Sequence, residues 1–227
     1  MRLISLLSVI LLAVISLIWL SRPRDSYLPF ALTIMFAGSV PFYAHFEGRK
    51  PPARELALMA IIIALAVAGR ALFMLLPQVK PMAAIVSIGA VALGPAAGFI
   101  IGSAAGLVSN FFFGQGLWTP FQMMGYGLVC VVMGLLFAPG RLPRRRWPLA
   151  ITAGFLTTLI YGFIVDSSSV LLLGAGLGPQ AVLGIYLAGV PFNLVHGAAT
   201  TLFMAWLGPV MLKRMERIHT RYGLSRT

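Results

Sequence analysis

The chain has 227 residues, of which 59% are hydrophobic and 10% are charged, and its mean hydropathy is +0.95. So much apolar surface cannot be buried in one soluble core of this length, so the composition predicts an integral membrane protein. The net charge is +12, but the basic residues lie mainly in short connections between apolar runs, which argues against a nucleic-acid partner. Cys130 is the only cysteine, which excludes a disulfide framework.

Eight apolar runs follow one another along the chain, and a helix needs about 20 apolar residues to cross the hydrocarbon. We expect spans at residues 3–20, 27–46, 54–76, 82–94, 95–112, 119–137, 148–173 and 181–212. The first run could imitate a signal peptide, but no small-x-small cleavage pattern follows it, so we expect a retained helix. The fourth and fifth spans fit only if both are short, with a break at Gly94-Pro95.

The distribution of Lys and Arg predicts the orientation. Thirteen of the 17 basic residues lie in connections that come to one side of the membrane, three come to the other side, and Arg70 lies within a span. The basic side is expected to be cytoplasmic, and eight spans then place both termini in the cytoplasm of a bacterial cell. The expected outer connections are 77–81, 113–119 and 174–179.

The composition changes near GRKPPARE, residues 48–55. The two helices before this point have no buried charge and few glycines, whereas the six after it contain most of the glycines and the polar residues at membrane depth. We therefore predict an all-α integral membrane protein in two parts. Residues 1–50 form a two-helix N-terminal extension, and residues 51–227 form a six-helix core with a basic cytoplasmic tail.

Small residues recur at helical spacing in two of the core helices. Glycines occupy every fourth position of residues 94–106, which predicts a seam where another helix backbone approaches closely. Alanines repeat in the same way on the first core helix, at Ala60, Ala64 and Ala68. Such an alanine ridge is usually internal packing, but it can also form a smooth external face for a partner's helix, and the periodicity leaves both open.

Two ionisable residues lie at membrane depth, Arg70 in the first core helix and Asp166 in the fifth. Buried ionisable residues in a membrane are costly, and they are therefore candidates for a functional site. One hypothesis is that the two side chains neutralise each other in the outer half of the bundle. The alternative is that Arg70 extends to the outer interface while Asp166 is capped by the serines at 167–169.

Neutral polar side chains accumulate at a similar outer depth, and His196 lies about a turn deeper. They are Asn110, Gln115, Gln122, Tyr126, Tyr161, Tyr186 and Asn193. A cavity lined by amides and aromatic rings, with little net charge, suits a bulky neutral ligand better than a small ion.

Motifs for catalysis or nucleotide hydrolysis are missing from the sequence. There is no Gly-x-x-x-x-Gly-Lys-Ser/Thr phosphate loop, no Gly-x-Ser-x-Gly, no His-Glu-x-x-His and no pair of membrane carboxylates. We expect no cofactor and no metal, and a membrane enzyme is the weaker class of function.

The core, from about residue 54 to residue 212, resembles the substrate-binding S components of energy-coupling factor (ECF) vitamin transporters. The resemblance rests on the six-helix plan with cytoplasmic ends, the alanine series and the outer connection FFFGQGLWTPFQM. It implies that the alanine face docks on a transmembrane coupling subunit, that two ABC ATPases drive transport, and that the outer connections wall the ligand pocket. The two N-terminal helices depart from the usual plan of that family.

Within the family, a connection of the form FFFGQG-x-WTPFQM resembles that of the S component associated with cobalamin uptake. Cobalamin is therefore the expected vitamin, with a different vitamin or a deazapurine precursor as the alternative. A second alternative is a structural or lipid-interacting protein of the bilayer, whose aromatic stretch is only an interfacial belt. The expected binding residues are Arg70, Asn110, Phe112, Phe113, Gln115, Trp118, Gln122, Tyr126, Asp166 and Asn193.

Overall fold

The computed structural model describes residue 14 and residues 28–138, 141–173 and 176–222. These residues form helices and no strand, which confirms the all-α fold class. The elements are α2 (Leu28–Gly48), α3 (Ala53–Leu72), α4 (Met82–Leu93), α5 (Pro95–Phe113), α6 (Thr119–Phe137), α7 (Arg146–Leu156), the π-helical turn η1 (Thr157–Tyr161), α8 (Gly162–Leu173) and α9 (Pro179–Tyr222). The helix expected at 3–20 lies outside the described residues, except for Val14.

Five described segments are long and apolar enough to cross a membrane. They are Ala53–Leu72, Pro95–Phe113, Thr119–Phe137, Arg146–Leu173 and Pro179–Ile218. Met82–Leu93 is a shorter apolar helix. The helix expected at 27–46 is formed, as α2, but it is not among these five, so its passage through the bilayer stays a prediction.

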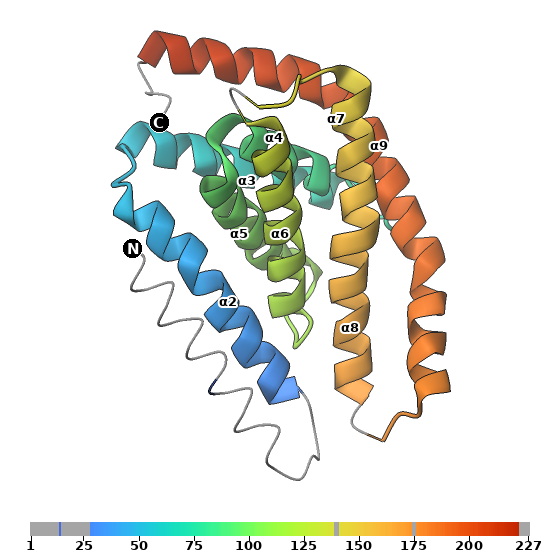
Figure 1. Ribbon diagram of the computed structural model, residues 1–227. Helices are drawn as coiled ribbons and strands as arrows, with labels where there is room; N and C mark the ends of the chain where they lie inside the picture. The colour runs from blue at the N-terminus through green and yellow to red at the C-terminus, as the bar shows by residue number, and fades with distance from the viewer. Residues whose placement is uncertain (1–13, 15–27, 139–140, 174–175, 223–227) are drawn as a thin grey trace.

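The short helix α4 lies at the centre of the bundle (Figure 1), packed against α3, α5, α6 and α9. Every residue from Met82 to Ala92 is buried, as expected of a helix that is apolar on all sides. The chain turns directly from α4 into α5 at Gly94, whose φ of 91° favours glycine, and Pro95 opens the next helix. The break predicted at Gly94-Pro95 is therefore confirmed.

The glycine face of α5 packs against α6. A Cβ atom added to Gly102 would lie 2.7 Å from the carbonyl oxygen of Tyr126 in α6, and one added to Gly98 would collide with Ala90 of α4. Because side chains larger than hydrogen do not fit at these positions, the four-residue repeat forms the close helix–helix seam that the sequence predicts.

The segment α7–η1–α8 runs beside α9 for most of its length (Figure 1). Gly154 and Gly197 each face the backbone of the other helix, and this lets the pair approach closely. The sequence predicts one uninterrupted helix at 148–173, whereas the structure has a π-helical turn inside it. Helix α9 extends beyond the predicted 181–212, and its C-terminal part lies across one end of the bundle (Figure 1).

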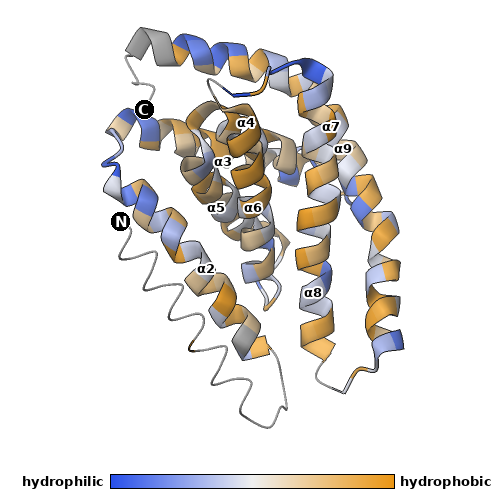
Figure 2. Cartoon of the chain, viewed as in Figure 1, coloured by the Kyte–Doolittle hydropathy of each residue, from blue (hydrophilic) through white to orange (hydrophobic). Residues whose placement is uncertain are grey.

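That end of the molecule is hydrophilic. Figure 2 shows the polar colour on the C-terminal part of α9, on the connection before α7 and around the α2–α3 turn. Arg144, in the connection before α7, joins α4, α6 and α9, because it donates hydrogen bonds to the carbonyl oxygens of Val91 and Phe137 and forms a 3.0 Å ion pair with Glu216. Its guanidinium thus binds free carbonyls near the ends of α4 and α6. The sequence predicts that this is the cytoplasmic side.

Helix α2 packs on α5 and α6 rather than on its neighbour in sequence, α3. The ring of Phe42 stacks on Phe99 with 4.3 Å between centroids, and the Tyr43 hydroxyl lies 3.0 Å from Ser103 Oγ. The described part of the extension, α2, therefore covers the outside of the α5–α6 pair.

Candidate functional site

A cavity of about 440 Å³ lies among the end of α3, the following connection, and the helices α5, α6, α8 and α9. It contains a rare combination for a membrane protein, because Arg70, Lys80 and Asp166 all line it. Aromatic rings and amides supply most of the remaining polar and ring surface. They belong to Gln78, Phe113, Gln122, Tyr126, Tyr161, Phe192 and Asn193.

One face of α9 forms a wall of the cavity. Gly189, Phe192, Asn193 and His196 all line it, and they recur at intervals of three and four residues. That spacing places side chains on one stripe of a helix, so a single amphipathic face presents all four to the site.

Arg70 projects from the last turn of α3 and is held on two sides. Its Nη1 atom donates a hydrogen bond to Ser109 Oγ and a 2.9 Å bond to Asn110 Oδ1. The guanidinium also lies over the ring of Phe113, 4.3 Å from its centroid. This cation–π contact and the two hydrogen bonds fix the plane of the guanidinium at the cavity wall.

Behind Arg70, Asn110 joins the arginine to the start of α6. Its Nδ2 atom donates to Gln122 Oε1 at 2.8 Å and to Thr119 Oγ1 at 3.0 Å. Thr119 in turn donates to Gln115 Oε1 at 3.0 Å. Asn110 is buried and is not among the residues that line the cavity, so it positions cavity residues instead.

Lys80 lies in the connection that follows α3 and binds the backbone of that connection. Its Nζ atom donates hydrogen bonds to the carbonyl oxygens of Phe73, Met74 and Leu76. Burial and the neighbouring Arg70 guanidinium lower the pKa of Lys80 from its ordinary value of 10.5. The ammonium group of Lys80 therefore already donates hydrogen bonds to three backbone carbonyls, although this residue borders the same cavity as Arg70.

Asp166 lies on α8 and is bound by a residue of α9. Its Oδ2 atom accepts a 2.7 Å hydrogen bond from Asn193 Nδ2. Gly162 allows the amide of Asn193 to approach, and Gly189 does the same for the carboxylate of Asp166, since an added Cβ would collide with either group. A glycine on each helix thus makes room for this contact between α8 and α9.

The hypothesis of an ion pair between Arg70 and Asp166 is wrong. The two line one cavity, but no ion pair joins them among the described residues. The alternative cap by the serines is also not formed, because Ser167 and Ser168 donate to the backbone carbonyls of Phe163 and Val165. Arg70 forms hydrogen bonds to residues of α5, and Asp166 accepts one from a residue of α9, so the two side chains are held separately.

Three rings pack together deep in the cavity. Tyr126 and Tyr161 lie 4.2 Å apart between centroids, and His196 meets Tyr161 edge-on at 4.9 Å. His196 is 3% exposed, and its Nε2 atom has no hydrogen-bond partner among the described residues. The described residues contain no group of three His, Cys, Asp or Glu side chains that could hold a metal ion.

Only part of the aromatic connection that was predicted to form the pocket wall lines the cavity. Phe113 and Gln122 line the cavity, whereas Phe112 and Trp118 are 66% and 41% exposed on the outside. Gln115 is also exposed, and its Nε2 atom donates to the carbonyl of Leu107. The two exposed rings have the placement of an interfacial belt, and their role in binding stays a prediction.

Of the ten predicted binding residues, six line the cavity. They are Arg70, Phe113, Gln122, Tyr126, Asp166 and Asn193. The prediction omitted Lys80, Gln78 and Phe192, although the expected outer connection at 77–81 pointed to the first two. Tyr186, expected at the same depth, instead stacks on Phe163 and lies 2.9 Å from Ser167 Oγ.

The alanine series on α3 lies on the surface. Ala60, Ala64 and Ala68 are all exposed, and the bulkier Ile61 and Leu65 beside them are 55% and 49% exposed. In the isolated chain this ridge therefore packs against no other described helix, which favours the external-face interpretation over internal packing.

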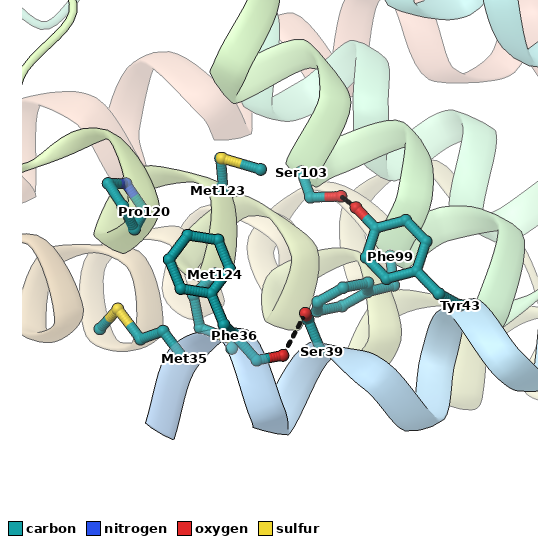
Figure 3. Close-up of a pocket in the computed structure, with 9 residues that line it drawn as sticks. All are labelled: Met35, Phe36, Ser39, Tyr43, Phe99, Ser103, Pro120, Met123 and Met124. Carbon is teal, nitrogen blue, oxygen red and sulfur yellow. Dashed lines mark hydrogen bonds between the residues drawn. The ribbon is translucent and has the colours of Figure 1, made fainter. Parts of the chain in front are cut away.

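A second pocket, of about 130 Å³, lies between α2 and the α5–α6 pair (Figure 3). No charged side chain lines it, and methionine and phenylalanine side chains supply most of its wall. Its hydroxyl groups are already occupied, since Ser39 donates to the carbonyl of Phe36 and Tyr43 pairs with Ser103 (Figure 3). The larger cavity is therefore the candidate site for a polar ligand.

Comparisons with known proteins agree with this architecture. A family model described as the S component of an ECF-type riboflavin transporter matches residues 52–216. A UPF0397 protein of Vibrio atlanticus (strain LGP32) is 28% identical over 146 residues, which are 61% of this chain and 74% of that protein. No solved structure matches the chain.

Proposed function

The chain belongs to the family of ECF-type riboflavin transporter S components, and we propose that its cavity binds a flat, amide-bearing vitamin of about the size of riboflavin. Proteins of this family are transport subunits and not enzymes, and they work with an ECF module made of a T component and ATPases. The chain is accordingly a multi-pass membrane protein. The observation that carries the proposal is the cavity itself, where fixed polar groups and aromatic rings meet within the family-matched region.

The size and lining of the cavity favour a flavin-like ligand. Its volume of about 440 Å³ lies within the range of roughly 300–1,000 Å³ that is typical for small-molecule sites. Phe113, Tyr126 and Tyr161 offer ring faces and edges, and Gln122 and Asn193 offer amides. A fused ring system with carbonyl and N–H groups matches both kinds of surface.

Cobalamin is the second candidate, because the connection FFFGQGLWTPFQM resembles that of cobalamin-associated S components. A corrin with its nucleotide tail is several times larger than a flavin, so it would extend beyond the cavity toward the connection at 114–118. Trp118 and Phe112 would then contact the ligand from the rim, which is consistent with their exposure.

The exposed alanine ridge supports a docking function for α3. Ala60, Ala64 and Ala68 form a face with short side chains on which a helix of the T component can approach closely and slide. In the proposed cycle the ligand is captured on the outer side, and the whole subunit then reorients against the T component. The basic end, with Arg144 and the C-terminal part of α9, would face the cytoplasm.

Uptake into proteoliposomes that contain this chain and an ECF module tests the proposal. Radiolabelled riboflavin is expected to accumulate in an ATP-dependent manner, and unlabelled riboflavin should compete. Accumulation of cobalamin, and not of riboflavin, would show that cobalamin is the substrate. Failure of both vitamins, with an intact complex, would contradict the proposed substrate class.

A further inference from the structure

Arg70 and Asp166 line the same cavity without forming an ion pair, and each retains polar atoms that have no hydrogen-bond partner among the described residues. We propose that they are two separate binding poles, so that the ligand carries two adjacent hydrogen-bond acceptors on one edge and an N–H donor on another edge. This inference rests on the proposed function, because it describes the ligand of the same cavity.

The first pole is one side of the Arg70 guanidinium. An arginine has five N–H donors, and the hydrogen bonds to Ser109 and Asn110 both come from Nη1. Among the described residues, Nε and Nη2 have no hydrogen-bond partner, and these atoms are not enclosed by protein. Together they form a planar fork that matches two acceptor atoms side by side.

The orientation of this fork is fixed in the absence of ligand. Asn110 and Ser109 hold one nitrogen, and the Phe113 ring lies 4.3 Å below the guanidinium carbon. Since the side chain cannot rotate without losing these contacts, binding requires little further ordering. Lys80 cannot replace it, because three backbone carbonyls already accept hydrogen bonds from its ammonium group.

The second pole is the Oδ1 atom of Asp166. The other oxygen, Oδ2, accepts the hydrogen bond from Asn193, and Oδ1 has no partner in the part of the chain that the structure describes. A carboxylate oxygen held in this way accepts an N–H donor from a ligand strongly. A neutral hydrogen-bond donor is sufficient, so the ligand needs no positive charge.

The two poles select a chemical class. A planar heterocycle with a carbonyl oxygen beside a ring nitrogen on one edge, and an N–H on another, supplies partners for both poles. Its faces can lie against the tyrosine and phenylalanine rings of the same cavity. At membrane depth an unsatisfied charge is costly, so a ligand that supplies partners to both residues gains affinity from each.

A double-mutant cycle without ligand tests whether the two residues are independent. Thermal unfolding of the purified full chain is compared for wild type, Arg70→Gln, Asp166→Asn and the double variant. Separate poles predict additive changes in melting temperature. A double variant that is more stable than either single variant would reveal a structural ion pair and overturn the inference.

A titration with riboflavin and 5-deazariboflavin tests the chemistry of the Arg70 pole, because the second probe has a C–H in place of one acceptor nitrogen. We expect wild type to bind 5-deazariboflavin about 10- to 100-fold more weakly than riboflavin. Arg70→Lys keeps the charge but removes the fork, so it should bind both probes with similar, reduced affinity. Asp166→Asn should weaken both probes and preserve the preference between them.

The outcomes separate this inference from the proposed function. If riboflavin binds wild type, Arg70→Lys and Asp166→Asn equally well, the two-pole inference is wrong while the flavin function stands. If riboflavin fails to bind wild type, the flavin function fails. In that case the ligand-free cycle still decides between separate poles and an ion pair.

Discussion

Arg70 donates a 2.9 Å hydrogen bond to Asn110, and Asn110 in turn donates a 2.8 Å hydrogen bond to Gln122. The cation at the end of α3 is thereby coupled to the first turns of α6 through one buried amide. Because a buried network is stable only when each member is satisfied, the shape of this cavity wall depends on a residue that does not face the cavity.

Replacing Asn110 with Ala is therefore expected to weaken ligand binding and to destabilise the fold. The change removes one hydrogen bond each from Arg70 Nη1, Thr119 and Gln122, and a typical hydrogen bond contributes about 0.5–1.5 kcal/mol to stability. Thermal unfolding and ligand titration measure the two effects. Asn110→Asp keeps the acceptor for Arg70, so it should retain more affinity; equal loss in both variants would contradict the coupling.

A bulky residue on the α3 ridge should block coupling and leave ligand binding unchanged. For Ala64→Leu we expect the affinity for the ECF module to fall about tenfold, equivalent to about 1.4 kcal/mol, because the helices can no longer approach closely. Pull-down of the module and ligand titration report the two properties. The matched control is Ala198→Leu, an exposed alanine on α9, which should assemble normally. Loss of assembly in both variants would argue against a specific docking face.

The α5–α6 seam predicts an unusual response to a single methyl group. Gly102→Ala adds a Cβ that would lie 2.7 Å from the Tyr126 carbonyl oxygen, and such overpacking costs about 1–3 kcal/mol. Elsewhere a helical Gly→Ala change is stabilising, by up to about 1 kcal/mol. Gly184→Ala in α9, where a Cβ meets no atom within 4 Å, is the control. Equal melting temperatures for the two variants would count against the seam.

Lys80 should give the stability a distinct alkaline pH dependence. Its pKa in the folded state lies below the ordinary value of 10.5, so above that lowered pKa the unfolded chain binds more protons than the folded protein. Stability therefore rises relative to a non-titrating variant as the pH increases toward 10.5. Lys80→Arg keeps the positive charge and does not titrate in this range, so the difference in unfolding free energy, wild type minus Lys80→Arg, should increase with pH. A constant difference would show that Lys80 titrates normally.

Much of the fold could be predicted because membrane helices appear in the sequence as long apolar runs. The Gly94-Pro95 break was predictable, since glycine permits the positive φ and proline opens a helix. The π-helical turn at Thr157–Tyr161 was not, because no Pro or Gly lies within it. The extension of α9 to Tyr222 was missed because its residues after Leu212 are rich in Lys and Arg and lack the apolar signal of a span.

The residue types of the candidate site could be predicted from the sequence, but the hydrogen-bond partners of its charged residues could not. Membrane depth identified Arg70 and Asp166, yet their partners come from Asn110 and Asn193, whose positions depend on how α5 and α9 pack. Depth also cannot tell whether a ring points inward. Phe112 and Phe113 are neighbours in sequence, but only Phe113 lies under the guanidinium of Arg70.

The most direct measurement is a titration of the purified, detergent-solubilised chain with riboflavin, followed by quenching of the flavin fluorescence. Stacking against the tyrosine and phenylalanine rings of the cavity predicts saturable quenching with one site per chain, and Arg70→Gln should weaken it. Unchanged fluorescence with wild type, together with saturable binding of cobalamin in a parallel calorimetric titration, would contradict a flavin-sized site.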